Sequence, residues 1–268
     1  MVITGAASGI GLGLAQEAAR RGASVVLWDR DAAGLDEAVT ATARLRTGLA
    51  RTPVAQVVDV TDRVAHRVAV GEALASNGGV DVLVNNAGVV SGKPLADLTE
   101  ADVRRTFEVN TLALYWVTQP FLASMVERDR GRIVTIASAS GLIGVARLTD
   151  YSASKWAAVG FDESLRVELA GQGSAVRTTV VCPYYIDTGM FAGVKTRFRW
   201  LLPILKPDQV VQATWNAVER DRSRVLLPPA VGTLPLLRSL PVGAFDKVAG
   251  VLGVNRTMDE FTGRPPAD

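Results

Sequence analysis

The sequence has very little cysteine and histidine, since Cys182 and His66 are the single residues of each kind. One cysteine excludes an internal disulfide and a cysteine metal cluster. One histidine argues against histidine acid–base chemistry and against a histidine-bound metal. His66 lies in the run Val64–Val68, which we interpret as a surface position on a helix. We therefore expect no metal site.

Long apolar runs and blocks of like charge are also missing. No stretch approaches the roughly twenty apolar residues of a transmembrane helix, and no signal peptide opens the chain, so we expect a soluble, cytoplasmic protein without a transmembrane segment. A net charge of +2 is too small for a nucleic-acid footprint, so we expect no nucleic-acid partner. The 268 residues, of which 48% are hydrophobic, are enough for one domain with a large core.

Short apolar runs alternate with helical patterns along the chain. This alternation predicts an α/β fold, a doubly wound Rossmann-type parallel sheet of about seven strands with helices on both faces. The strands are expected at Val2–Thr4, Ser24–Trp28, Val54–Val58, Val80–Val84, Arg132–Ala137, Arg177–Cys182 and Arg224–Leu227. Long helices are expected at Leu12–Arg21, after a capping box at Thr99, at Tyr151–Ala170, and from Lys206 to about Arg220.

A glycine-rich turn, Thr4–Gly11, follows the first predicted strand. Glycines let the backbone turn tightly and approach a pyrophosphate, which the N-terminus of the next helix attracts. Asp29 ends the second predicted strand, eighteen residues past the turn, where an acidic side chain binds ribose hydroxyls and repels a 2′-phosphate. A strand-end turn residue is the alternative interpretation of Asp29. In this turn the residues expected to bind the dinucleotide are Gly5, Ser8, Gly9, Ile10 and Gly11.

Tyr151 and Lys155 stand four residues apart, and Ser138 lies thirteen residues before Tyr151. A step of four places both side chains on one face of a helix. A phenol titrates near pH 10, and lowering its pKa by about three takes about 4 kcal/mol. One cation at an effective dielectric of about 20 supplies an energy of that order. We therefore predict that Lys155 favours the phenolate of Tyr151 and that Ser138 binds the reacting oxygen.

These motifs, taken in order, resemble the short-chain dehydrogenases/reductases. The resemblance covers roughly residues 1 to 190 and rests on Thr4–Gly11, Asp59-Val60, Asn85–Gly88, Asn110, Ser138, Tyr151–Lys155 and Cys182-Pro183. It implies a catalytic tetrad of Asn110, Ser138, Tyr151 and Lys155. Two further stretches, Leu27–Asp29 and Val181–Phe191, are similar to the retinol and hydroxysteroid dehydrogenase branch, which acts on lipophilic alcohols.

The resemblance also implies how the cofactor is held. Asp59 and Val60 meet the adenine, Asn86, Ala87 and Gly88 the adenosine ribose, Lys155 the nicotinamide ribose, and Thr188 the carboxamide. Tyr151, Pro183 and Ile186 complete the expected cofactor contacts. Asn110 is expected to hold a water that carries the proton away from Lys155, and a helix-bending polar residue is the alternative.

The expected reaction is NAD-dependent oxidation of a lipophilic alcohol, or the reverse reduction, with Tyr151 as acid and base. Asp29 favours NAD over NADP, whereas Arg30 is the one basic residue placed to meet a phosphate. An NADPH-dependent ketone reductase therefore stays open as the alternative. So does a protein that binds the dinucleotide without catalysis, although all four tetrad positions are filled.

Two segments fall outside the regular alternation of the single domain 1–268. The first, 188–207, mixes bulky apolar residues with cations, and we expect a substrate lid. A subunit-contact helix and peripheral membrane contact are its alternatives. The second, 228–268, is expected to cover the substrate mouth or a neighbouring subunit, or to be a structural wrap. A homodimer or homotetramer is expected from apolar residues on the two long helices, namely Leu114, Trp116, Phe121, Trp156 and Phe161.

Overall fold

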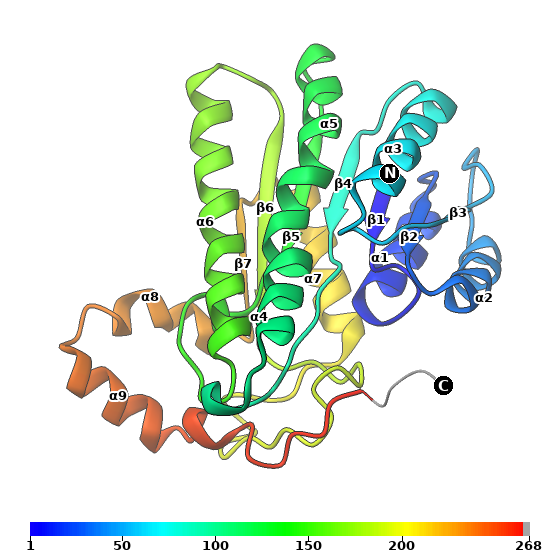
Figure 1. Cartoon of the computed structure of the whole chain (residues 1–268). Coiled ribbons are helices and arrows are strands. Elements are labelled where there is room, and N and C mark those ends of the chain that lie inside the picture. Colours follow the sequence, from blue (N-terminus) through cyan, green and yellow to red (C-terminus); the bar gives the residue numbers. More distant parts are fainter. Residues whose placement is uncertain (265–268) are drawn as a thin grey trace.

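The structure is a computed structural model that describes residues 1–264, apart from the side chains of residues 76 and 77. Its centre is a seven-stranded parallel sheet in the order β3-β2-β1-β4-β5-β6-β7, which confirms the predicted Rossmann-type fold (Figure 1). The strands are β1 (Val2–Thr4), β2 (Val26–Asp29), β3 (Val54–Val57), β4 (Val82–Asn85), β5 (Arg132–Ile136), β6 (Arg177–Pro183) and β7 (Arg224–Leu227). The helices are α1 (Gly9–Arg20), α2 (Ala32–Ala43), α3 (Arg63–Asn77), α4 (Glu100–Phe107), α5 (Ala113–Glu127), α6 (Thr149–Gly171), α7 (Pro207–Glu219), α8 (Leu234–Leu237) and α9 (Val242–Val251).

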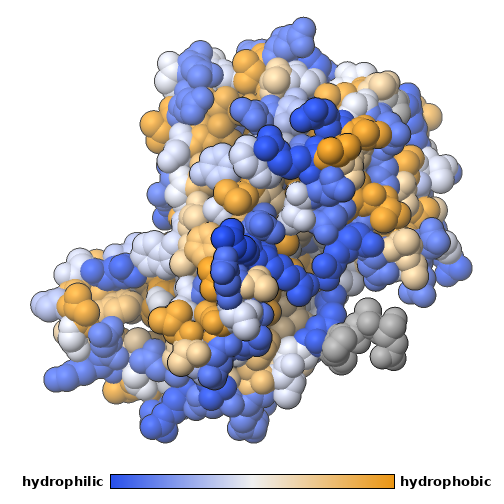
Figure 2. Space-filling model, viewed as in Figure 1, coloured by the Kyte–Doolittle hydropathy of each residue, from blue (hydrophilic) through white to orange (hydrophobic). Residues whose placement is uncertain are grey.

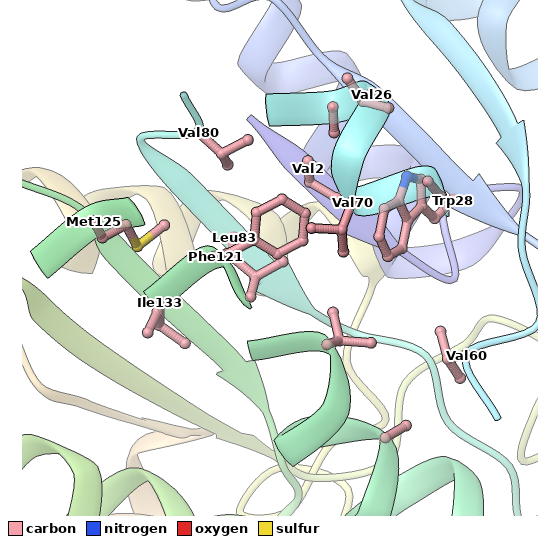
Figure 3. Close-up of a cluster of buried hydrophobic side chains, with 14 of the residues drawn as sticks. Val2, Val26, Trp28, Val60, Val70, Val80, Leu83, Phe121, Met125 and Ile133 are labelled. Carbon is pink, nitrogen blue, oxygen red and sulfur yellow. The ribbon is translucent and has the colours of Figure 1, made fainter. Parts of the chain in front are cut away.

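Each face of the sheet is covered by its own set of helices. Val2 packs on one side with α3, α5 and α6, in a cluster that also holds Trp28 and Phe121 (Figure 3). The next residue, Ile3, points to the other face and packs with α1, α2 and α7. Because neighbouring strand residues alternate between the two faces, a strand covered on both sides must be apolar throughout. This explains the continuous apolar runs in the sequence.

Local boundaries differ slightly from those predicted. Helix α1 begins at Gly9, three residues earlier than expected, so the second half of the glycine turn is already helical. Thr99 forms the expected capping box with Asp102 and opens α4. The long helix after it is interrupted by a π-helical turn, Glu108–Leu112, before α5 continues. An extra residue in one turn changes which side chains share a face, and such turns are frequent at functional sites.

The prediction for His66 is wrong. His66 is buried, with only 7% of its surface exposed. It occupies the inward stripe of α3, together with the buried Ala69, Val70 and Ala73. These residues follow it at steps of three, four and seven, which is the spacing of one face of a helix. This helical spacing is visible in the sequence. The polar character of histidine suggested a surface position, whereas the spacing places His66 on the buried face of α3.

The expected oligomer surface is also partly wrong. Phe121 and Leu114 are buried inside their own subunit, so neither is available to a partner. Trp156 on α6 remains 40% exposed, and Tyr115 on α5 is 47% exposed. The helices α5 and α6 stand side by side in Figure 1, and each keeps one of these partly exposed aromatic side chains.

The segments outside the regular alternation gather at one end of the sheet. All strands are parallel, so their carboxyl ends meet at one edge, where ligands of such sheets bind. The segment 188–207 and the described part of the C-terminal extension lie beneath this edge, and α8 and α9 project from it (Figure 1). Within residues 1–264, no helix combines the length and the apolar character that crossing a membrane requires.

Candidate active site

The glycine turn between β1 and α1 forms one wall of a cleft of about 1090 Å³. Gly5 and Gly9 have left-handed backbones, with φ of +65° and +58°, which favour glycine. A Cβ on Gly11 would lie 2.1 Å from the carbonyl oxygen of Gly5, so this position packs the turn and does not line the cleft. Ser8 does not cap α1 with its side chain, which leaves first-turn N–H groups to attract an anion.

Asp29 lies at the end of β2 beside this turn and lines the same cleft. Its Oδ2 accepts a hydrogen bond of 3.0 Å from the N–H of Ala7, and its Oδ1 accepts one of 3.2 Å from the N–H of Asp31. These bonds hold the carboxylate at the cleft, where ribose hydroxyls could donate to it. Arg30 is exposed and lines the cleft next to it.

The loop after β4 closes the cleft from the other side. Thr4 Oγ1 accepts from the N–H groups of both Asn86 and Ala87 at 3.0 Å. The Asn86 amide donates to the carbonyl oxygens of Thr4 and Gly5 at 2.9 and 3.0 Å. Its amide therefore ties the β4 loop to the glycine turn. The other expected cofactor residues that line the cleft are Asp59, Val60, Ala87, Gly88, Pro183, Ile186 and Thr188.

The structure brings Ser138, Tyr151 and Lys155 together at the centre of the cleft, and all three are buried. The Ser138 side chain is hydrogen-bonded to Tyr151. Ser138 Oγ also accepts from the N–H of Ser140 at 3.1 Å, which fixes the hydroxyl after β5. A Cβ on Gly141 would lie 2.6 Å from the Lys155 carbonyl oxygen, so the Ser138 turn is packed directly against α6.

Burial acts on Tyr151 and Lys155 in opposite directions, because it disfavours the charged form of each. It raises the pKa of Tyr151, and the Ser138 hydrogen bond offsets only part of this effect. It lowers the pKa of Lys155 to about 8. Lys155 Nζ lies 5.7 Å from the centre of the Tyr151 ring and donates to the Ile136 carbonyl oxygen at 2.9 Å. In the protein without a ligand, burial therefore dominates the pKa of Tyr151 and favours its protonated form.

Asn110 is buried in the π-helical turn and does not line the cleft. Its Oδ1 accepts from the N–H of Val89 at 2.8 Å, and its Nδ2 donates to the Val89 carbonyl oxygen at 2.9 Å. The same Nδ2 donates to Ser154 Oγ at 3.0 Å, and Ser154 Oγ donates to the Tyr151 carbonyl oxygen at 2.7 Å. Asn110 thus joins the β4 loop to the turn of α6 that carries Tyr151, and its place in the π turn agrees with the helix-bending interpretation.

Aromatic rings surround the reacting end of the cleft. The Phe191 ring lies 5.6 Å from the Tyr151 ring and 5.1 Å from the Tyr185 ring, both edge to face. Tyr185 OH is within 2.8 Å of Thr257 Oγ1, so the C-terminal extension reaches this wall. Trp200, in contrast, does not line the cleft and is 81% exposed.

Sequence reasoning missed a buried polar cluster beside the site. The Asp150 carboxylate accepts hydrogen bonds of 2.7 Å from Ser91 Oγ and from Thr106 Oγ1. It joins α4 and the β4 loop to the residue before Tyr151. No motif in the sequence connects these three positions. The contact of the last described residues with the glycine turn was missed as well, because a lone arginine in a tail carries no pattern.

The family model described as short chain dehydrogenase matches residues 1–197. The chain belongs to the short chain dehydrogenase family. It is 39% identical over 267 residues to epidermal retinol dehydrogenase 2 of Mus musculus, covering 98% of this chain and 85% of that protein. It is 38% identical over 285 residues to retinol dehydrogenase 10 of Homo sapiens, covering 97% and 84%.

Solved structures of this family share the fold. A short chain dehydrogenase/reductase from Burkholderia phymatum in complex with NAD matches with a TM-score of 0.78 at 26% identity, over 100% of this chain and 95% of that one. Actinorhodin polyketide ketoreductase with NADPH matches with a TM-score of 0.78 at 28% identity, over 86% and 96%. The predicted family and its retinol dehydrogenase-like branch are confirmed. The protein is an oxidoreductase that interconverts alcohol and carbonyl groups with a nicotinamide dinucleotide.

Proposed function

We propose that this short-chain dehydrogenase uses NAD to oxidise a lipophilic primary or secondary alcohol, or to reduce the matching carbonyl. One observation carries the proposal. A single cleft connects the glycine turn, the Ser138–Tyr151 pair and a large apolar wall. The apolar wall is built by Phe191, Leu201, Leu202, Leu234, Leu237, Phe245, Val248 and Leu252. The retinol dehydrogenases among its relatives support a lipophilic substrate.

The apolar wall comes from the expected lid, 188–207, and from α8 and α9 of the C-terminal extension. Side chains of the segment 188–207 meet those of α8 and α9 around the cleft. Hydrophobic atoms continue onto the projecting surface of α8 and α9, where hydrophilic groups are mixed among them (Figure 2). A polar substrate would gain nothing from this wall, whereas each methylene buried against it contributes about 0.8 kcal/mol.

The proposed chemistry begins from the protonated phenol of Tyr151. When bound, the nicotinamide supplies the acceptor or donor of the hydride. In reduction, Tyr151 Oη gives its proton to the carbonyl oxygen as that oxygen gains negative charge. Ser138 Oγ holds the same oxygen by a hydrogen bond. In oxidation, Tyr151 takes the hydroxyl proton, and this direction needs positive charge around the ring because burial alone favours the phenol.

Lys155 and Asn110 have supporting roles in this proposal. Lys155, with its pKa at about 8, is still mostly protonated at neutral pH and supplies one positive charge behind the ring. Its ammonium would also hold the nicotinamide ribose. Asn110 keeps the β4 loop and the first turns of α6 in register through Val89 and Ser154. In the proposed mechanism, Asn110 also holds a water that carries the proton away from Lys155.

NAD is the proposed cofactor because the residues beside the adenosine end fit it. The Asp29 carboxylate accepts from two backbone N–H groups at the edge of the cleft, and a 2′-phosphate there would be repelled. Arg30 favours the alternative, an NADPH-dependent ketone reductase, since it is exposed and lines the same part of the cleft. Measuring kcat/KM once with NAD(H) and once with NADP(H) distinguishes the NAD-dependent dehydrogenase from the NADPH-dependent ketone reductase.

The test of the mechanism is Tyr151→Phe. This change removes the proton carrier and leaves the ring contact with Phe191, so turnover should fall at least a hundredfold while NADH binding stays near wild type. Wild type and variant are assayed with retinoid-, steroid- and alkyl-type alcohols and ketones, each with NAD(H) and NADP(H). A variant that keeps more than a few per cent of the wild-type rate would remove Tyr151 from the role of acid and base.

We also propose a homodimer or homotetramer that pairs through α5 and α6. Trp156, Tyr115 and Val167 are exposed on these helices, and Leu112 is exposed in the π-helical turn just before α5. Large apolar side chains gathered on one surface usually mark an interface, and soluble oligomers are mostly symmetric.

A further inference from the structure

The last described residues, 257–264, form a segment that we call the C-terminal strap. It is hydrogen-bonded to the segment 188–207 along its length. The N–H of Lys195 donates to the Thr257 carbonyl oxygen at 3.2 Å. The N–H of Thr262 donates to the Ala192 carbonyl oxygen at 2.9 Å. These hydrogen bonds tie the strap to the expected lid at both of its ends.

Two glycines receive the strap where no side chain would fit. A Cβ on Gly193 would lie 2.0 Å from the Glu260 carbonyl oxygen. A Cβ on Gly92, in the loop after β4, would lie 2.0 Å from the ring of Phe261. Both glycines also have left-handed φ values, of +85° and +68°, which favour glycine. The strap therefore lies in a seat that reaches from the expected lid to the β4 loop.

The seat directs Arg264 to the glycine turn. Arg264 NH1 donates to Ser8 Oγ at 3.2 Å, and its NH2 donates to the Thr188 carbonyl oxygen at 3.2 Å. The guanidinium lines the cleft together with Gly9 at the start of α1. Its partners are thus neutral oxygens, and no carboxylate of residues 1–264 forms an ion pair with it.

Arg264 is an exposed cation, and an anion that binds between it and the start of α1 would meet positive charge from both sides. The N-terminus of a helix carries a partial positive charge of its own, so Arg264 and α1 present positive charge to one point of the cleft. Guanidinium groups bind phosphate oxygens with two parallel hydrogen bonds, and neutral oxygens replace these only weakly. The arrangement is complementary to a phosphate group held between Ser8 and Thr188.

We propose that Arg264 binds the pyrophosphate of the dinucleotide from the side opposite α1, so that the C-terminal strap closes over the cofactor. The inference rests on the proposed function, in which the glycine turn that contains Ser8 approaches the pyrophosphate and Thr188 meets the nicotinamide carboxamide. Arg264 contacts both residues, so it lies where the pyrophosphate leads to the nicotinamide half. Through the strap, cofactor binding would also hold the segment 188–207 near Tyr151.

The test compares ligands with and without the pyrophosphate, using direct binding and not turnover. Dissociation constants of NADH, ADP-ribose and adenosine are measured by titration calorimetry for the full-length wild type, Arg264→Ala and Arg264→Lys. Arg264→Ala should weaken NADH and ADP-ribose at least tenfold and leave adenosine within twofold, because only the first two carry the phosphates. The affinities of Arg264→Lys for NADH and ADP-ribose should lie between those of the wild type and those of Arg264→Ala, because lysine keeps the charge without the planar guanidinium.

Arg256→Ala is the matched control. Arg256 is an exposed cation just before the strap and does not line the cleft, so this variant should bind all three ligands as the wild type does. If Arg264→Ala binds NADH and ADP-ribose as tightly as the wild type does, the inference is overturned. A parallel loss of adenosine affinity would also overturn it and would make the strap a structural wrap only. A wild type that binds neither NADH nor NADPH would instead overturn the proposed function.

Discussion

A buried acid on α6 makes stability depend on pH in a way that one substitution should remove. Asp162 lies on α6, eleven residues after Tyr151, and only 1% of it is exposed. Its Oδ2 accepts from Thr178 Oγ1 at 3.1 Å, and its Oδ1 has no hydrogen-bond partner among the described residues. Burial raises the pKa of Asp162 to about 7, although Thr178 and two nearby arginines act in the other direction.

The sign and size of the effect follow from this shift. An unfolded aspartic acid titrates near pH 3.9, so below about pH 4 the group is protonated in both states and costs nothing. Between about pH 4 and pH 7 the unfolded chain releases the proton while the folded protein keeps it. Folding stability is therefore lost as pH rises through this window, by about 4 kcal/mol in total. Asp162→Asn keeps the acceptor for Thr178 and removes the titration.

The assay is urea unfolding of wild type and Asp162→Asn at several pH values from 4.5 to 8.5. Other groups titrate in both proteins, so the quantity of interest is the difference in unfolding free energy between them. This difference should move by several kcal/mol in favour of Asp162→Asn as pH rises. Glu163→Gln is the control, because Glu163 is partly exposed and paired with Arg224, and its effect should stay near zero. A difference for Asp162→Asn that is constant with pH would refute the reasoning.

Three further predictions concern cofactor, substrate and assembly. Asp29→Ala should raise catalytic efficiency with NADP relative to NAD at least tenfold, because it removes the repulsion of the 2′-phosphate; a wild type that already prefers NADP would contradict the NAD assignment. Phe191→Ala should lower kcat/KM about tenfold for steroid- or retinoid-sized alcohols and little for propanol-sized ones, and the exposed Trp200→Ala is its control. Equal losses for large and small alcohols would count against the lid. Light scattering at micromolar concentration should give the mass of a dimer or tetramer, and a monomer mass would argue against pairing through α5 and α6.

The fold was predictable because its signals are local. Seven short apolar runs became seven parallel strands, and the capping box at Thr99 opened α4 as expected. The errors arose where a position depends on packing between distant segments. Phe121 and Leu114 were expected at an interface, but their side of α5 faces the sheet and α6. An apolar helix residue faces either its own core or a partner, and periodicity alone does not distinguish the two.

The positions of the candidate site residues were predictable where the signal is local. The step of four between Tyr151 and Lys155 fixed their common face, and the strand-turn-helix pattern placed Gly5 and Asp29 at one cleft. The Asp150 cluster and Arg264 were not found, because their partners lie far away in the chain. Arg264 meets Ser8 across 256 positions, and no spacing rule reaches so far.

The spacing of residues in the sequence does not predict how deeply a side chain is buried, and the pKa of Tyr151 depends on that burial. The sequence argument assigned an effective dielectric of about 20 and concluded that one lysine charge is sufficient. The structure places Phe191 and Tyr185 around the phenol, both from segments after β6, and this burial raises the pKa of Tyr151 more than its surroundings lower it. Burial also lowers the pKa of Lys155 to about 8, so its ammonium loses the proton more readily than that of an exposed lysine. Burial around Tyr151 therefore favours the phenol, which is the form that the proposed reduction direction starts from.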